Sequence, residues 1–219
     1  FHGNGVPQDI AQAITLWKRA AMTGLVEAQA SLGVIYTQNA GVPVDIKQAI
    51  FWLEKAAAQD YTMAQFQLGT MYEHGQGIPE NYAKAVKYYT LAAEQGYPAA
   101  QCNLADKYEK GLGVAQDVAH AIQWYEKAAH QGAAPAQYSL GQLYEKGQGV
   151  AADTNTAMHW YGLAAAQGDQ DAKVSLNTLR KSSGLAQPEA AEPTDAQGLF
   201  DLGIAYDIGS GELPIDHAR

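Results

Sequence analysis

The sequence predicts an all-α fold, an α/α solenoid built from helix-loop-helix repeats of 36 residues. Three series of residues share this spacing and indicate the period. Glycines recur at Gly5, Gly41, Gly77, Gly113 and Gly149. Leucines recur at Leu32, Leu68, Leu104, Leu140 and Leu176. Ala-Ala pairs begin at Ala20, Ala56, Ala92, Ala128 and Ala164. Because all three series keep one register, the chain is a succession of equivalent units.

The first helix of a unit is predicted from apolar residues spaced by three and four positions. In residues 61–96, Ala64, Leu68 and Tyr72 form such a stripe on one helical face. The glycine-rich segment at 73–79 follows this stripe. Its two glycines supply the positive φ angles that end a helix and turn the chain.

The second helix of this unit is predicted to begin at Asn81, because Asn and Asp side chains accept an unpaired backbone N–H at a helix start. The other units carry Asp9, Asp45, Asp117 and Asp153 at this position. Gly96 is predicted to close the helix in the left-handed conformation. The equivalent glycines are Gly24, Gly132 and Gly168. Asp60 replaces the glycine once, which should cost a little stability.

Small and bulky residues alternate between the two helices of a unit. The first helices carry Gly33, Gly69, Ala105 and Gly141 at one position. The second helices carry Trp52, Tyr88, Trp124 and Trp160. This pattern predicts a close approach of the two helices, with the aromatic residues in the core. One unit alone cannot bury its apolar stripe, so the units must stack on one another.

The repeat motif is most complete in the fourth full unit. Residues 136–150 read Ala-Gln-Tyr-Ser-Leu-Gly-Gln-Leu-Tyr-Glu-Lys-Gly-Gln-Gly-Val, and Asp153, Trp160-Tyr161, Ala164-Ala165 and Gly168 follow. This pattern resembles the Sel-one-like repeat (SLR) family, a relative of the tetratricopeptide repeats. The resemblance covers residues 1–180 and resumes after residue 195. It implies a right-handed α/α superhelix.

The register divides the chain into a solenoid, a linker and a partial repeat. Residues 1–180 form the SLR solenoid, which contains a half repeat, four full repeats at 25–60, 61–96, 97–132 and 133–168, and then a lone helix. Residues 181–195 lack an apolar period and are predicted to be a linker or long loop. Residues 196–219 begin a further, truncated repeat. Either the chain is a piece of a longer array, or this last helix folds back as a cap.

Composition excludes several classes of protein. The chain has 219 residues, of which 47% are apolar and 17% charged, so it is not a disordered protein. The lack of a basic column along the repeats is the main argument against nucleic acid as a partner, because most of the net charge of −9 lies in residues 182–219. A single cysteine, Cys102, excludes an internal disulfide framework. No apolar run is long enough for membrane insertion.

The residues point to no catalytic site, metal site or cofactor. The histidines form no metal-binding pattern and are expected on the surface: His2, His74, His120, His130, His159 and His217. The glycine loops follow helices and lack the Lys-Ser/Thr ending of a phosphate-binding loop. Cys102 is expected to be a packing or surface thiol. Glu73, Glu109 and Glu145 share one position and are expected to be equivalent, solvated acids, unlike the paired carboxylates of a glycosidase.

Four positions on the side of the first helix opposite the apolar stripe vary between repeats. In related repeats the first helix lines the concave face of the solenoid, where partners bind. The first position holds Ala30, Phe66, Cys102 and Tyr138. The second holds Val34, Thr70, Asp106 and Gln142. The third holds Thr37, Glu73, Glu109 and Glu145. The fourth holds Gln38, His74, Lys110 and Lys146.

These positions predict a groove for an extended segment of a partner. Phe66 and Tyr138 would anchor the segment, and the acids would select basic or polar groups. The alternative is an ordinary solvated face with some packing between repeats. If the prediction holds, replacing both aromatic residues by Ala abolishes binding with little loss of stability.

The function predicted from the sequence is a non-catalytic scaffold or adaptor that binds a partner protein or peptide. The resemblance adds a bacterial envelope or host-interaction role, and favours a periplasmic or secreted location over a cytoplasmic one. One alternative is a purely structural spacer in a longer repeat protein. Another is a cell-wall or β-lactam-related enzyme, but the relatives linked to that activity carry paired cysteines within each repeat, and this chain has only Cys102.

Overall fold

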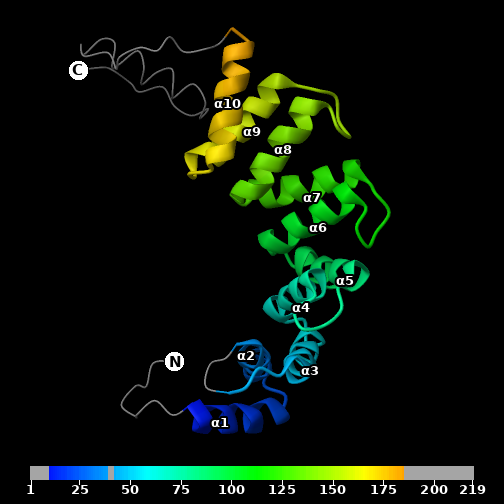
Figure 1. The fold of residues 1–219 in the computed structure, drawn as a ribbon, viewed down its shortest axis with the longest axis vertical. Helices are drawn as coiled ribbons and strands as arrows, with labels where there is room; N and C mark the ends of the chain where they lie inside the picture. The colour runs from blue at the N-terminus through cyan, green and yellow to red at the C-terminus, as the bar shows by residue number, and fades with distance from the viewer. Residues whose placement is uncertain (1–9, 39–41, 185–219) are drawn as a thin grey trace, which may run out of the picture. The chain divides into compact units, whose positions relative to one another are not determined.

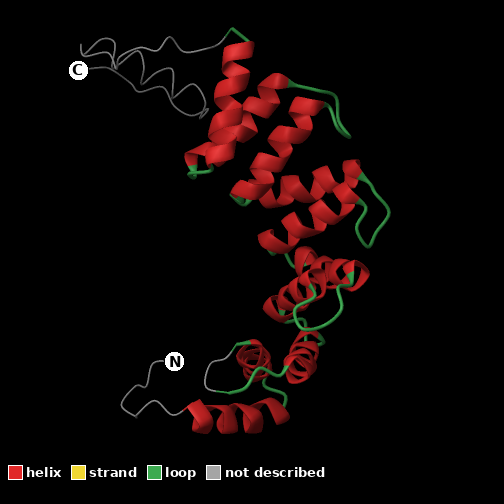
Figure 2. Ribbon diagram, viewed as in Figure 1, coloured by secondary structure: helices red, strands yellow, loops and turns green. Residues whose placement is uncertain are grey.

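The protein is all-helical throughout the part that the structure, a computed structural model, describes, namely residues 10–38 and 42–184. Figures 1 and 2 show helices joined by loops, without a strand in these ranges. The helices are α1 (Ile10–Met22), α2 (Val26–Thr37), α3 (Ile46–Ala57), α4 (Thr62–His74), α5 (Tyr82–Glu94), α6 (Pro98–Lys110), α7 (Val118–His130), α8 (Ala134–Lys146), α9 (Thr154–Ala166) and α10 (Gln170–Ser182). The predicted all-α class is therefore confirmed.

The helices pack as a succession of pairs. The most extensive contacts join α2 to α3, α4 to α5, α6 to α7 and α8 to α9. Each second helix then packs on the first helix of the next pair, as α3 does on α4 and α5 on α6. Contacts therefore follow the order of the chain, as expected of an α-solenoid.

The chain divides into two compact units, residues 1–176 and 177–219. The first unit holds the helix pairs from α2 to α9, together with α1 and the start of α10. Of the second unit, the structure describes residues 177–184, where α10 ends at Ser182. The helix thus includes the first two residues of the predicted linker. The remaining linker residues and the truncated repeat at 196–219 lie outside the described residues.

The second helices begin where capping side chains were predicted. The Asp45 carboxylate accepts the backbone N–H of Gln48 at 3.0 Å, and the Asn81 side chain accepts that of Lys84 at 2.9 Å. Asp117 and Asp153 act in the same way. These bonds satisfy backbone donors that have no partner inside the helix. Asp9, the fifth predicted cap, lies outside the described residues.

The second helices of the complete pairs are followed by one residue with a positive φ angle. This residue is glycine after α5, α7 and α9, and its φ angle is 86° at Gly96. After α3 the residue is Asp60, with a φ angle of 59°. A side chain disfavours this conformation, so the exception predicted at Asp60 is confirmed as a site of mild backbone strain.

The close approach of paired helices is confirmed, but the bulky partner of the small residue differs from the predicted one. A Cβ atom added to Gly69 would lie 2.6 Å from the ring of Tyr89, and one added to Gly141 would lie 2.5 Å from the ring of Tyr161. The predicted partner in the second pair was Tyr88, one residue earlier. The Tyr89 side chain is fully buried, whereas the Tyr88 ring instead stacks on Tyr72 at 5.9 Å.

Candidate partner-binding surface

One side of each first helix carries the same buried side chains in every full repeat. Three positions make up this side, which we call the repeated frame. They are alanine at 28, 64, 100 and 136, glutamine at 29, 65, 101 and 137, and leucine at 32, 68, 104 and 140. None of these residues is more than 4% exposed. The repeated frame therefore forms the core between neighbouring helices.

The buried glutamines join three helices through one side chain each. Gln65 of α4 donates from Nε2 to the carbonyl oxygen of Ala57, at the end of α3, over 3.2 Å. Its Oε1 accepts Nε2–H of Gln95, just after α5, at 2.7 Å. The same pair of bonds recurs at Gln29, Gln101 and Gln137. Each glutamine thus ties its own helix to the second helices before and after it.

These glutamine bonds matter because the amides are shielded from water. A buried amide or carbonyl left without a partner costs about 1–3 kcal/mol. The repeating pattern satisfies the glutamine amide and also a carbonyl at the end of a helix, where helices have unpaired acceptors. It fixes the register of successive helices at each junction from α1 to α9.

The opposite side of the first helices carries the variable residues predicted to bind a partner. We call it the variable face, defined by positions 30, 34, 37 and 38 and their equivalents. Its two predicted anchors are half-buried and contact their own chain. The Phe66 ring meets Tyr97 edge-on at 4.9 Å and lies 5.8 Å from Tyr89. Tyr138 lies 5.6 Å from Tyr161, and its hydroxyl accepts an N–H of Gln142 at 3.0 Å.

The glutamates of the variable face accept hydrogen bonds from buried tyrosines of the second helices. Tyr89 donates to Glu73 at 2.5 Å. The equivalent bonds are Tyr125 to Glu109 at 2.9 Å and Tyr161 to Glu145 at 2.6 Å. Burial, followed by the bond to Glu73, raises the pKa of Tyr89, so the hydroxyl keeps the proton that it donates. Glu73 and Glu109 are half-buried, which corrects the expectation of equivalent, solvated acids; only Glu145 is exposed.

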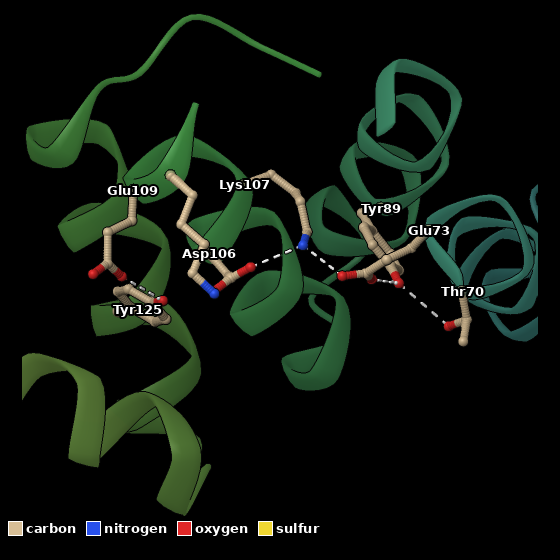
Figure 3. A network of polar contacts seen from close by, with 8 residues as sticks. Thr70, Glu73, Tyr89, Asp106, Lys107, Glu109 and Tyr125 are labelled. Atoms are coloured by element: carbon tan, nitrogen blue, oxygen red, sulfur yellow. Dashed lines mark hydrogen bonds and ion pairs between the residues drawn. The ribbon is translucent and has the colours of Figure 1, made fainter. Parts of the chain in front are cut away.

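A buried lysine joins the variable residues of two neighbouring repeats (Figure 3). Lys107 is 3% exposed, and its Nζ lies 2.5 Å from the Glu73 carboxylate and 2.8 Å from that of Asp106. Asp106 also pairs with Lys110 at 2.5 Å. Two of the three pairs share the buried ammonium, so the cluster links α4 to α6. The predicted site residues Glu73, Asp106 and Lys110 are thereby brought together.

The cluster keeps its charges despite burial. Burial disfavours the charged form of Lys107, but its bonds to Asp106 and Glu73 outweigh this and raise the pKa of the ammonium. Burial acts against the Asp106 carboxylate too, yet the bonds from Lys107 and Lys110 lower its pKa. The variable face thus holds fixed charges of both signs at the centre of the array.

The remaining predicted site residues lie around this cluster. The Thr70 hydroxyl donates to the Phe66 carbonyl oxygen at 3.1 Å and lies 3.4 Å from the Tyr89 hydroxyl. His74 and Lys146 are exposed at the ends of their helices. Lys110 is 57% exposed even though it pairs with Asp106. These residues present polar groups around the half-buried aromatic rings.

The Cys102 thiol and the His120 ring, both singled out in the sequence, have packing contacts in the described residues. Burial raises the pKa of the Cys102 thiol to about 11, which makes it a poor nucleophile at neutral pH. His120 packs against Tyr108, with ring centres 4.2 Å apart, and accepts the indole N–H of Trp124 at 3.1 Å. Across residues 10–38 and 42–184, no group of three or more His, Cys, Asp or Glu side chains could hold a metal ion. None of the described helices is long and apolar enough to cross a membrane.

The stacked helix pairs, the repeated frame and the variable face define an α-solenoid repeat protein. Comparison with known protein families identifies the family of this repeat protein. The Sel1 repeat model matches residues 1–25, 26–61, 62–97, 98–132, 134–169 and 196–219. The chain therefore belongs to the Sel1 repeat family, as its resemblance to SLR proteins predicted.

Two solved structures illustrate the relationship. A protective antigen of uropathogenic Escherichia coli strains with an SLR fold is 37% identical, with a TM-score of 0.73 over 90% of this chain. This chain spans only 42% of the length of that antigen. A Sel1 repeat protein from Oxalobacter formigenes is 33% identical, with a TM-score of 0.70 over 94% of this chain and 82% of its own. No curated protein sequence matches the chain.

Two buried features of the first helices were not predicted from the sequence. The glutamines at 29, 65, 101 and 137 keep the period of 36 residues, and this signal could have marked them as structural. Lys107 stands where other first helices carry Ile35, Met71 and Leu143. A charge in an otherwise apolar column was visible in the sequence, but its partner Glu73 lies one repeat away and required the structure.

Proposed function

We propose that this Sel1 repeat protein is a non-catalytic scaffold that binds a segment of a partner protein on its variable face. One observation carries the proposal. The repeated frame has the same residues in every full repeat, whereas the variable face presents a different set on each helix. The frame residues, which hold neighbouring helices together, follow the repeat, and so do the glutamates bonded to buried tyrosines. The residues at positions 30 and 34 and their equivalents do not follow it, which favours a role in recognition.

The chemistry of the variable face supports a protein or peptide as the partner. The half-buried rings of Phe66 and Tyr138 can add apolar contact area, because each is already held in place by a neighbouring aromatic ring. The fixed charges of Asp106 and Lys110 lie between them along the array and can pair with side chains of an extended segment. Sel1 repeat proteins commonly act as protein-interaction scaffolds, which agrees with this proposal.

The test is a selection of random peptides on the immobilised full chain, followed by affinity measurements on two variants. Thr70→Arg with Gln142→Arg places two large charged side chains on the variable face. Gln123→Arg places one on the exposed side of α7 as a matched control. We expect the selected peptides to lose binding to the double variant and to retain it with the control.

Two results would contradict the proposal. A selection that enriches no peptide would favour the alternative of a purely structural spacer. Peptides that bind the double variant as well as the wild type would place recognition elsewhere. Turnover of the chromogenic β-lactam nitrocefin by the purified chain, lost in a point variant, would instead support an enzyme.

We further propose a bacterial envelope or host-contact role. The support is the E. coli relative, which is a protective antigen and is 37% identical to this chain. Fractionation of cells that express the gene from its own start tests this role. Recovery with periplasmic, surface or culture-medium proteins is expected, and recovery only with cytosolic proteins would contradict it.

A further inference from the structure

The variable face contains a cavity of about 410 Å³ among α1, α2 and α4. Its walls include Trp17 of α1, Ala30 and Val34 of α2, Tyr61 before α4, and Met63 and Gln67 of α4. Met63 is 45% exposed, so the cavity reaches the surface at this edge. Its volume lies within the range of roughly 300–1,000 Å³ typical of ligand pockets.

The cavity exists because one aromatic ring is missing from the repeat pattern. Ala30 occupies the position that Phe66 holds in the next repeat. There the Phe66 ring packs edge-on against Tyr97, at 4.9 Å. Tyr61 is the equivalent of Tyr97 and lines the cavity beside Ala30. The junction between the first and second full repeats thus retains the aromatic wall, Tyr61, but lacks the ring that would lie against it.

We propose that this cavity receives one phenylalanine side chain from the extended segment of a partner protein. The incoming ring takes the place that Phe66 occupies one repeat further along and packs against Tyr61 as Phe66 packs against Tyr97. This inference rests on the proposed function, because it assumes that the variable face binds a partner segment. It adds the position of an anchor and the chemistry of the residue that fills it.

The lining of the cavity favours an uncharged ring over other side chains. The described residues that line it are all uncharged, so a lysine or glutamate would lose its hydration without gaining an ionic partner among them. In the fourth full repeat, Gln142 donates a hydrogen bond to the Tyr138 hydroxyl. The equivalent residue beside the cavity is Val34, which offers no such donor. Phenylalanine therefore fits better than tyrosine.

Polar groups at the cavity suit the backbone of an extended segment. Ser31, Gln38 and Gln67 belong to the lining, and Gln38 is exposed. Their hydroxyl and amide groups can hydrogen-bond to peptide groups on both sides of an inserted side chain. The arrangement combines one apolar anchor with a polar surround, which is typical of peptide recognition.

The test uses the full chain with isotope-labelled methionine methyl groups, so that the Met63 resonance reports on the cavity. The probes are the uncharged N-acetyl amides of phenylalanine and tyrosine, together with that of lysine. We expect saturable shifts of the Met63 methyl with the phenylalanine probe, weaker binding of the tyrosine probe and none of the lysine probe. Ala30→Phe fills the cavity from within and should weaken binding of the phenylalanine probe by about tenfold or more.

Two further variants control for specificity and for failure of Ala30→Phe to fold. Gln123→Phe adds the same ring on the exposed side of α7, away from the cavity, and should leave binding at Met63 unchanged. If Ala30→Phe fails to fold, as judged by circular dichroism, Ala30→Met fills the same space with a more flexible side chain. The proposal is overturned if Met63 does not respond, if Ala30→Phe binds as tightly as the wild type, or if the lysine probe binds equally well.

Further results distinguish this proposal from binding of a second copy of the chain and from failure of the proposed function. Met63 shifts that depend on protein concentration without a probe would show that a second copy fills the cavity, and would overturn it. A phenylalanine probe that binds at Met63, while no peptide needs the variable face, would contradict the proposed function and leave the cavity assignment intact. Selected peptides that need Thr70 and Gln142, but bind the Ala30→Phe variant as tightly as the wild type, would contradict the cavity assignment and leave the proposed function intact.

Discussion

The repeated frame and the variable face lie on opposite sides of the same helices, yet they differ in how each repeat uses them. On α4, the frame residues Gln65 and Leu68 have identical counterparts in the other three first helices. Phe66 and Thr70, on the variable face of the same helix, have none. The geometry of stacking requires the same contacts at every junction, whereas recognition of a partner does not.

The difference also appears in burial and bonding. Frame side chains are shielded from solvent and paired in a repeating pattern of glutamine bonds. Residues of the variable face are mostly half-buried or exposed. Apart from the repeated tyrosine–glutamate bond, their contacts differ from repeat to repeat, as in the charge cluster around Lys107. Stability therefore comes mainly from the frame, which leaves the variable face free to differ.

The first prediction contrasts neighbouring residues of α4 on the two sides. Leu68→Ala removes a fully buried side chain and should lower the free energy of unfolding by about 3 kcal/mol. Phe66→Ala removes a half-buried ring and should cost about 1.5 kcal/mol. Urea denaturation followed by circular dichroism measures both. Equal losses would mean that Phe66 belongs to the core instead of the variable face.

The second prediction concerns the buried glutamines. Gln65→Leu leaves the Ala57 carbonyl oxygen and the Gln95 amide without their partner, and should lower the free energy of unfolding by about 2 kcal/mol. Gln123→Leu, on the exposed side of α7, is the matched control and should change little. The role assigned to these glutamines is wrong if the two variants denature at the same urea concentration.

The third prediction uses pH to probe the charge cluster. The folded state lowers the pKa of Asp106, so its stabilising effect is present above the unfolded value of about 4 and is lost as the pH falls through the lower, folded value. Asp106→Asn lacks this contribution. On acidification from about pH 7 to about pH 3, the wild type should therefore lose more stability than the variant. Parallel stability curves would show that the cluster does not stabilise the fold.

The fourth and smallest effect is expected at Asp60. Its positive φ angle suits glycine, which stands at the same position in the other repeats. Asp60→Gly should raise the free energy of unfolding by about 0.5 to 1 kcal/mol. The reciprocal change, Gly96→Asp, should lower it by a similar amount. Thermal denaturation of both variants checks the pair, and a stabilising Gly96→Asp would contradict the argument.

Much of the fold could be predicted because the period places equivalent residues in register. The spacing of Leu68 and its equivalents located the first helices, and Asn81 and Asp45 marked the starts of second helices. The period could not tell which of Tyr88 and Tyr89 lies over Gly69. Adjacent residues differ by only 100° around a helix, and both face the apolar side.

The candidate surface was less predictable, because its contacts join residues at different positions of neighbouring repeats. The period does not indicate which of these residues meet. The sequence placed Glu73 on the variable face but not its bonds to Tyr89 and Lys107. Burial of a charge depends on a partner from the neighbouring repeat, and the cavity beside Ala30 depends on a side chain that is missing. Such features follow from differences between repeats, which a common period hides.

The most direct test of the central claim is amide hydrogen exchange of the full chain, with and without a peptide selected on it. If the variable face binds partners, the peptide slows exchange in the first helices α2, α4, α6 and α8, and leaves the second helices α3, α5, α7 and α9 nearly unchanged. Protection confined to the second helices, or spread equally over both sets, would contradict the division between a stabilising frame and a recognising face.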